Sequence, residues 1–362
     1  MRPTWIEVNL GIISNNVQQI RRRVGANVKL MAVVKANAYG YGLLPISLYL
    51  ANQVDYFGVA LVEEAIALRQ AGIQTPILSF NCYIDQYIEA AQHDVEVAVS
   101  VVKAVAAIET ACRFIDTGLK VHVEVDTGMG ITGIEPEQVL YCVELLQQIP
   151  QCKVVGLYSQ LALSEYAEPD DKQLSKQADC FKTLADCLSS IPLKHLLASP
   201  GVALCPELHY GMVRCGCILF NGASQGGSWD LRDSMTLKSQ VTMLRQHLRG
   251  ASLGYKPRTH QAMRVAIVPI GYGDGYNREV SSSGEILIRG KRYPIVGDIC
   301  MDKLAVEIED DPIAVGDEVV LLGCQGQEAI TLRQIAESTC QNEAIATIGF
   351  TDRIPRIYSC SV

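Results

Sequence analysis

The sequence predicts an α/β fold in which a TIM-like (β/α)8 barrel, residues 1–225, precedes a mainly antiparallel β domain, residues 226–362. First, short apolar runs alternate with longer amphipathic runs between residues 28 and 220. Second, the stretch from Gly222 to Asp230 is rich in glycine and serine, which is typical of a linker or long loop. Third, β-branched runs separated by Gly, Asp and Pro follow it. A chain of 362 residues is long enough for two such domains.

The expected barrel strands are short, apolar and followed by turn-forming residues. They are Lys29–Val34, Asp55–Ala60, Pro76–Phe80, Val95–Val99, Leu119–Val125, Lys153–Tyr158, His195–Ala198 and Ile218–Phe220. Helical patterns lie between most of them, at Glu63–Ala71, Tyr83–Gln92, Val101–Cys112, Pro136–Gln148 and Asp171–Ser189. This alternation is typical of parallel sheets, and eight units suit a closed barrel. A doubly wound sheet is the alternative, weakened because no glycine-rich dinucleotide motif follows the first strand.

The second part of the chain shows the pattern of a small antiparallel barrel or sandwich. Its expected strands are Ser239–Leu248, Met263–Val268, Gly284–Ile288, Arg292–Val296, Asp302–Ile308 and Glu318–Leu322. One helix, near Thr331–Ser338, is expected to interrupt them.

Composition excludes several classes of function. The net charge is −8 without a basic block, which argues against nucleic-acid binding. No apolar run reaches the length of about 18 residues that a membrane span needs, and the first residues lack the apolar segment of a signal peptide. The thirteen cysteines are scattered through apolar segments, which favours reduced thiols over disulfides. Only Cys215 and Cys217 are close in sequence, so we expect no metal site and a cytoplasmic protein.

Lys35 is the first candidate for chemistry. It follows the apolar run Met31–Val34 and is itself followed by small residues and Tyr39. A lysine at the C-terminal end of a buried strand, with no charged neighbour in sequence, is unlike a solvated surface lysine. It is either paired with a carboxylate or desolvated and ready to form a Schiff base, and the local sequence leaves both possibilities open.

Other reactive groups are expected at the same mouth of the barrel, where catalytic residues of such folds lie. They are Tyr39, Glu124, Asp126–Gly130, Gln160, Ser199 and Met212–Cys217. A single lysine, a late serine and the backbone amides of Gly216 and Cys217 suggest a phosphate-bearing cofactor that a lysine could bind covalently. Pyridoxal phosphate fits that description.

Five motifs occur in the order seen in alanine racemases, and the chain resembles that family over nearly its whole length. The motifs are VVKANAYG at Val33–Gly40, DTGMG at Asp126–Gly130, MVR at Met212–Arg214, IGYGDG at Ile270–Gly275 and ICMD at Ile299–Asp302. The resemblance implies a pyridoxal 5′-phosphate enzyme that interconverts L- and D-alanine. It also implies a head-to-tail homodimer in which the partner's β domain completes each active site.

The resemblance assigns two bases. Lys35 would hold the cofactor through a Schiff base and then act on one face of the substrate Cα, while Tyr255 of the other subunit would act on the opposite face. Racemisation needs a base on each face, so this pair makes chemical sense. Tyrosine has an ordinary pKa near 10 and can serve only where nearby cations favour its phenolate.

The resemblance also assigns binding roles. Arg214 would face the pyridine nitrogen and leave it largely unprotonated, because an arginine keeps its proton. The phosphate would be bound by Tyr39, Ser199 and the amides of Gly216 and Cys217. Met301 would offer its N–H to the substrate carboxylate, Tyr272 and Arg278 would line the entrance, Asp302 would support that region, and His195 would support Arg214 or be a core histidine. Gln160 stands where the family usually has a histidine stacked on the ring.

Three further positions depart from the family pattern. Ile131 replaces an arginine that helps to bind the substrate carboxylate, and Glu124 replaces a carbamylated lysine that orients that arginine. Asp352 replaces a tyrosine beside the substrate side chain, as a small polar residue does in the racemase domain of vancomycin-resistance serine racemases. We therefore expect L- and D-serine, and other polar amino acids, to be possible substrates beside alanine.

The same residues are compatible with other functional interpretations. A basic-amino-acid decarboxylase would need a longer chain, and a single-domain pyridoxal-phosphate-binding protein would lack the β domain. A catalytically degraded cofactor-binding or regulatory protein is suggested by the changes at Ile131, Gln160 and Asp352, although Lys35 and Tyr255 are both present.

Overall fold

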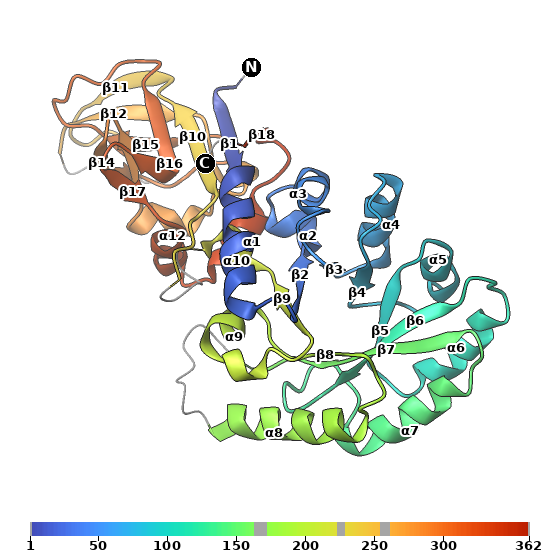
Figure 1. The fold of residues 1–362 in the computed structure, drawn as a ribbon. Coiled ribbons are helices and arrows are strands. Elements are labelled where there is room, and N and C mark those ends of the chain that lie inside the picture. Colours follow the sequence, from blue (N-terminus) through green and yellow to red (C-terminus); the bar gives the residue numbers. More distant parts are fainter. Residues whose placement is uncertain (1, 163–171, 223–228, 254–260, 361–362) are drawn as a thin grey trace. The chain divides into compact units, whose positions relative to one another are not determined.

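The computed structural model describes residues 2–162, 172–222, 229–253 and 261–360. It contains two compact units (Figure 1). The barrel unit comprises Ile13–Ala38 and Leu43–Arg232, and the β unit comprises Met1–Ile12, Tyr39–Gly42 and Asp233–Val362.

Eight parallel strands form the barrel unit, as the sequence predicts. They are β2 (Lys29–Val33), β3 (Tyr56–Val59), β4 (Ile77–Ser79), β5 (Glu96–Val99), β6 (Leu119–Val125), β7 (Cys152–Ser159), β8 (Leu193–His195) and β9 (Met212–Cys215). They pair in the order β8-β7-β6-β5-β4-β3-β2-β9. An isolated parallel bridge between Ala198 and Arg214 joins the two ends of this order, so the barrel is nearly closed.

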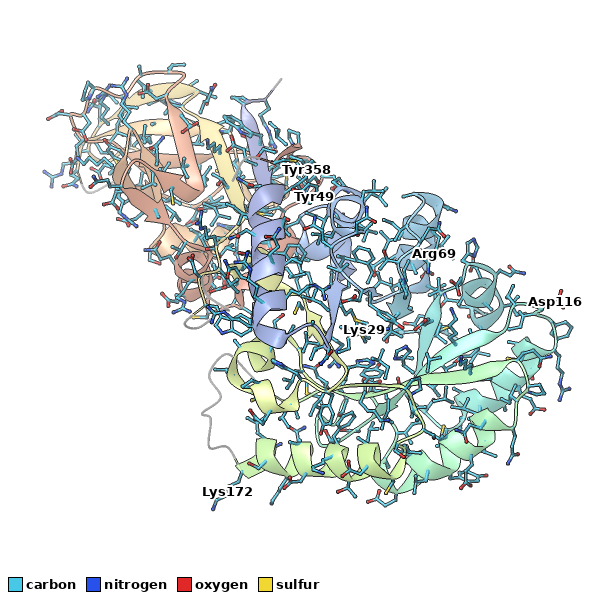
Figure 2. The ribbon with its side chains drawn as sticks, viewed as in Figure 1. Lys29, Tyr49, Arg69, Asp116, Lys172 and Tyr358 are labelled. Atoms are coloured by element: carbon cyan, nitrogen blue, oxygen red, sulfur yellow. The ribbon has the colours of Figure 1, made fainter. Side chains whose placement is uncertain are left out.

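Helices follow most of these strands. Those of the barrel unit are α1 (Leu10–Val24), which starts in the β unit, α3 (Leu43–Leu50), α4 (Val62–Gln70), α5 (Tyr87–Gln92), α6 (Ala104–Cys112), α7 (Pro136–Gln147), α8 (Lys172–Cys187), α9 (Ser199–Leu204) and α10 (Cys217–Phe220). Figure 1 shows α4 to α8 outside the strands. Helix α8 buries Phe181 and Leu184 and exposes polar residues on its other side, the usual pattern of a helix that covers a barrel. Figure 2 labels Lys172 at its start.

The first six predicted strands are confirmed, but the last two predictions are wrong. Strand β8 shares only His195 with the predicted segment, and the last strand is Met212–Cys215, not Ile218–Phe220. Residues 217–220 form the short helix α10, in which Ile218, Leu219 and Phe220 are buried. In a buried apolar run of three or four residues, the spacing of apolar residues does not distinguish a strand from a helix. The strand Met212–Cys215 was not predicted because the charged Arg214 interrupts its apolar sequence.

Ten strands form the sheet of the β unit. They are β1 (Thr4–Asn9), β10 (Met235–Gln240), β11 (Met243–His247), β12 (Met263–Val268), β13 (Glu285–Ile288), β14 (Lys291–Val296), β15 (Leu304–Glu307), β16 (Glu318–Gln325), β17 (Glu328–Ile330) and β18 (Arg356–Ser359). Nine follow the order β11-β12-β15-β14-β13-β16-β10-β1-β18, and β17 pairs with β16. Only β1 and β18 pair in parallel, so the sheet is mainly antiparallel, as predicted.

The β unit differs from the prediction in three additional strands, β1, β17 and β18, and in two further details. The single predicted strand Ser239–Leu248 is divided between β10 and β11, because the first pairs with β1 and β16 and the second with β12. The predicted helix is α12 (Leu332–Thr339), and a second one, α13 (Glu343–Gly349), follows it. Helix α12 starts with a capping box, in which Thr331 and Gln334 exchange hydrogen bonds.

Two structure-wide observations bear on function. All thirteen cysteines are free thiols. In the part of the chain that the structure describes, no helix combines the length and the apolar character that a bilayer crossing requires.

Candidate active site

The strand ends of the barrel unit bring several predicted site residues to one mouth. Strand β2 pairs with β9 so that Ala32 lies opposite Cys215, and Lys35 and Gly216 therefore extend from neighbouring strand ends. The bridge between Ala198 and Arg214 places the start of α9 beside the same strand. Parallel strands all point their carboxyl ends to one side, so these residues share the face where barrel enzymes carry their chemistry.

Lys35 begins a turn of unusual backbone conformation, α2 (Lys35–Tyr39). Ala36, Asn37, Ala38 and Tyr39 have φ values of 53°, 55°, 50° and 55°, so four consecutive non-glycine residues are left-handed. Each costs about 1–2 kcal/mol relative to the right-handed form. Lys35 is exposed, and no carboxylate of the described residues pairs with it, so the structure shows neither of the two environments expected from the sequence, an ion pair or a desolvated amine.

Glu64 holds the start of this turn. Its Oε1 accepts a hydrogen bond from the N–H of Ala36 at 2.7 Å, and its Oε2 accepts from Ala60 and Leu61 at 2.8 and 3.2 Å. Glu64 is the third residue of α4, a position where glutamate commonly reaches back to the residues before its helix. That capping signal was present in the sequence, but the long-range bond to Ala36 was not foreseeable from it.

Arg214 is buried at this mouth with 4% of its surface exposed. Its Nη2 donates to the carbonyl oxygens of Ser159 and Leu196 and to Oε1 of Gln160, at 2.8, 3.1 and 2.8 Å. Its Nη1 donates to Nδ1 and to the backbone oxygen of His195, both at 3.1 Å. Burial lowers the pKa of Arg214 to about 10, so the guanidinium still carries its charge at neutral pH.

Ser199 lies against the amides that follow β9. Its Oγ accepts hydrogen bonds from the N–H of Gly216 at 2.9 Å and of Ile218 at 3.4 Å. A hydroxyl beside backbone N–H groups is a typical surrounding for a phosphate. The structure thus brings together Ser199 and Gly216, with Cys217 next in sequence; Tyr39 belongs to the other compact unit.

Glu124 is satisfied by hydroxyl groups rather than by a cation. Its Oε2 accepts from Ser100 at 2.5 Å, its Oε1 accepts from Thr132 at 3.2 Å, and Tyr158 also donates to it. Burial, followed by the charge of Glu124, raises the pKa of Tyr158 well above its ordinary value, so this hydroxyl keeps its proton. The position that the family resemblance assigns to a carbamylated lysine is here a buried carboxylate, 9% exposed.

The loop after β6 carries the substituted position Ile131. One carboxylate, that of Asp126, accepts hydrogen bonds from the N–H groups of Gly128, Met129 and Gly130 and so closes the loop. The side chain of Ile131 is 76% exposed. Ile131 therefore contributes little buried apolar surface to stability. At this position, where the family pattern has a charged side chain, the loop carries an exposed apolar one.

A second group of predicted residues lies together in the β unit. The N–H groups of Tyr272 and Gly273 donate to the backbone oxygens of Cys300 and Met301, at 3.1 and 2.9 Å. Arg353 joins this pair of loops, because it contacts Asp302 at 2.6 Å and the fully buried Asp274 at 3.4 Å.

The remaining candidates of the β unit are more exposed. The Asp352 side chain is 95% exposed and lies 3.5 Å from Nη1 of Arg356, whose Nε donates to the backbone oxygen of Gly40 at 2.7 Å. Arg278 is paired with Asp298 at 3.0 Å. Tyr255 lies outside the described residues. No cluster of potential metal ligands occurs among the residues that are described.

The donor set of the barrel mouth fits pyridoxal phosphate. It offers an exposed amine at Lys35 for a carbonyl group, a hydroxyl and amides around Ser199 for a phosphate, and a buried cation at Arg214 that can donate to an unprotonated ring nitrogen. Fold and site therefore define a barrel protein of the pyridoxal-phosphate type.

Comparison with known proteins identifies the family. The model of the alanine racemase N-terminal domain matches residues 8–224, and that of the C-terminal domain matches residues 234–358. The alanine racemase of Symbiobacterium thermophilum is 35% identical over 99% of this chain and 97% of its own length, and that of Halothermothrix orenii is 32% identical over the same shares. The chain belongs to the alanine racemase family, whose enzymes are pyridoxal 5′-phosphate-dependent isomerases.

Solved structures agree with that assignment. The alanine racemase of Clostridium difficile 630 superposes with a TM-score of 0.91 at 31% identity, covering 99% of this chain and 96% of that one. The alanine racemase of E. faecalis superposes with a TM-score of 0.92 at 30% identity, covering 99% and 98%.

Proposed function

We propose that this protein interconverts the L- and D-enantiomers of alanine with pyridoxal phosphate, as a cytoplasmic homodimer with shared active sites. The observation that carries the proposal is the barrel mouth, where Lys35 extends from the strand next to the buried Arg214. Thirteen free thiols support a reducing compartment.

The chain's own residues perform the proton transfers in this proposal. When bound, pyridoxal phosphate makes the Cα–H of an attached amino acid acidic. The Lys35 amine removes or returns a proton on one face of Cα, and Tyr255 of the partner subunit does so on the other. Arg214 keeps its proton and offers only hydrogen bonds to the ring, which limits electron withdrawal and favours racemisation over side reactions.

Solvent deuterium exchange tests the reaction. Holoprotein incubated in D2O with L-alanine is expected to yield Cα-deuterated alanine of both configurations, measured by chiral chromatography and mass spectrometry. Lys35→Ala is expected to abolish the exchange. Absence of exchange with both alanine and serine would instead identify a cofactor-binding protein that does not racemise.

Subunit complementation tests the shared site. Lys35→Ala and Tyr255→Phe proteins, each with little activity, are mixed under conditions that allow subunit exchange. Half of the dimers are then mixed, and each mixed dimer has one intact site, so about one quarter of the wild-type activity should return. A mixture that stays inactive, although mixed dimers are detected by native mass spectrometry, would contradict the shared site.

Serine is proposed as a second substrate because Asp352 takes the position that the family resemblance gives to a tyrosine beside the substrate side chain. A carboxylate can accept a hydrogen bond from a hydroxyl, and Asp352 is smaller than the tyrosine it replaces. Asp352→Tyr should lower the ratio of kcat/KM for serine to that for alanine. Asp310→Tyr, at another exposed aspartate of the β unit, is the matched control. An unchanged ratio in Asp352→Tyr would refute the role of Asp352.

A further inference from the structure

One hydrogen-bonded chain crosses the barrel interior from Arg214. Nη1 of Arg214 lies 3.1 Å from Nδ1 of His195, Nε2 of His195 lies 3.0 Å from Nδ1 of His122, and Nε2 of His122 lies 2.8 Å from Oε2 of Glu96. The four residues come from β9, β8, β6 and β5. Glu96 and Arg214 are each 4% exposed, and both histidines are fully buried.

The directions of the bonds in this chain follow from its two ends, the Arg214 guanidinium and the Glu96 carboxylate. A guanidinium can only donate, so Nδ1 of His195 must accept and its proton must be on Nε2. That Nε2–H donates to Nδ1 of His122, whose own proton is therefore also on Nε2 and points at the Glu96 carboxylate. A donor at one end and an acceptor at the other leave one consistent arrangement, with both imidazoles neutral.

We propose that Glu96 and His122 are positioning residues of the racemase site. Glu96 fixes the tautomer of His122, His122 fixes that of His195, and His195 then presents a lone pair to Arg214 and holds the guanidinium in the orientation that faces the cofactor ring. Neither Glu96 nor His122 touches substrate or cofactor in this role. The functional part of the inference rests on the function proposed above.

The surroundings of the chain support a neutral His195. The ring of Tyr158 stacks on it, with centroids 4.9 Å apart and 3° between the planes, and so fixes the plane of the imidazole. Burial, followed by the charge of Arg214, lowers the pKa of His195 well below its ordinary value. Among the described residues, the ionic groups that contact the histidines or Tyr158 are Arg214, Glu96 and Glu124, and Lys120 lies near Glu96.

The Glu96 carboxylate, which accepts the last hydrogen bond of the chain, is positioned by other side chains. Tyr56 donates a hydrogen bond to its carboxylate, and Nζ of Lys120 lies 3.9 Å from its Oε1. Lys29 lies over the Tyr56 ring, 5.1 Å from its centroid, at the start of β2, the strand that ends before Lys35 (Figure 2 labels Lys29). The two cations lie near the N-terminal ends of the strands, so the chain connects that end of the barrel with the mouth.

Two ordinary core histidines with no positioning role would also pack here, and NMR distinguishes the two cases. In 15N-histidine-labelled holoprotein, the proposal requires protonated Nε2 and unprotonated Nδ1 at both His122 and His195. The same measurement on cofactor-free protein determines the tautomers of His122 and His195 independently of racemase activity. A protonated Nδ1 at His195 in the wild type would overturn the proposal, and this result needs no variant.

Variants of Glu96 test the effect on catalysis. Glu96→Gln keeps an oxygen acceptor and should retain both tautomers and near-wild-type kcat/KM. Glu96→Leu removes the acceptor, and we expect mixed tautomers and a 10- to 100-fold loss of kcat, typical of a misplaced active-site group. Glu109→Leu, at a glutamate whose side chain is 54% exposed, is the control. If the Glu96→Leu variant kept the tautomers and the kcat of the wild type, the proposal would be refuted. If the unmodified protein had the required tautomers but no racemase activity, only the proposed racemase function would be refuted.

Discussion

Nη2 of Arg214 donates a hydrogen bond to Oε1 of Gln160 at 2.8 Å, and this contact fixes the orientation of the Gln160 amide. Its oxygen faces the guanidinium, so its NH2 group points to the other side, where it meets the Leu161 carbonyl only at 3.4 Å. An amide does not titrate, whereas the histidine that the family usually has at this position changes charge between about pH 5 and 8. The side chain at position 160, beside Arg214, thus stays uncharged over that whole pH range.

Replacing Gln160 by leucine should destabilise the protein. The substitution removes one of the three acceptors of Arg214 Nη2, while the carbonyl oxygens of Ser159 and Leu196 still accept from its two N–H groups. The expected cost is therefore that of one net hydrogen bond, about 0.5–1.5 kcal/mol of unfolding free energy. Gln160→His keeps an acceptor and should lose less. Urea unfolding followed by circular dichroism measures both, and Gln138→Leu, at an exposed glutamine of α7, is the control. Equal stability of Gln160→Leu and Gln138→Leu would contradict the prediction.

Glu64→Ala should weaken cofactor binding more than it weakens the fold. Three N–H groups lose their acceptor, but they lie near the surface and can bond water, so we expect about 1–2 kcal/mol of lost stability. The turn after Lys35 becomes mobile, which should raise the dissociation constant of pyridoxal phosphate roughly tenfold. Equilibrium dialysis measures it. Glu63→Ala, at the adjacent exposed residue, should leave it unchanged.

The left-handed turn predicts opposite signs for two alanine-to-glycine changes. At Ala36, φ is 53°, and glycine removes about 1–2 kcal/mol of backbone strain against about 0.4–1 kcal/mol of extra entropy in the unfolded chain. Ala36→Gly should therefore stabilise the protein by about 0.5–1 kcal/mol. Ala106→Gly, at an exposed position within α6, should destabilise it by a similar amount. Two destabilised variants in thermal unfolding would show that the turn is not strained.

The sequence predicted what is local and could not predict what depends on distant partners. The motif around Lys35 and the alternation of strands and helices depend on neighbouring residues, and the structure has them. Arg214 lies inside the last strand because acceptors from two other segments, Ser159–Gln160 and Leu196, surround it. The sequence around Arg214 gives no indication of these distant partners. Strands β1 and β18 come from opposite ends of the chain and pair only in the folded state.

Acid should destabilise the protein partly through His195. The folded protein keeps this imidazole neutral, because burial and Arg214 lower its pKa, whereas the unfolded chain binds a proton below about pH 6.5. Protons therefore favour unfolding, and stability falls by up to about 1.4 kcal/mol per pH unit below pH 6.5 from this group. His195→Gln should show a smaller slope between pH 5 and 6.5 and the same slope as wild type between pH 7 and 8. Identical slopes below pH 6.5 would mean that His195 titrates normally.

Restoring an arginine at position 131 should improve substrate binding. Ile131 is 76% exposed, so its replacement costs little packing. A guanidinium in reach of a substrate carboxylate adds a charge-assisted hydrogen bond of about 1.5–3 kcal/mol, but the carboxylate of Glu124 is engaged by hydroxyls and does not orient the new side chain. Ordering a free arginine costs up to about 2 kcal/mol, so we expect the lower end, a three- to tenfold decrease in KM for L-alanine. Met129→Arg places the same charge on the same loop, two residues away, and controls for general attraction of an anion. If both variants lower KM equally, long-range attraction explains the effect, and the loss of the family arginine has not changed a specific contact.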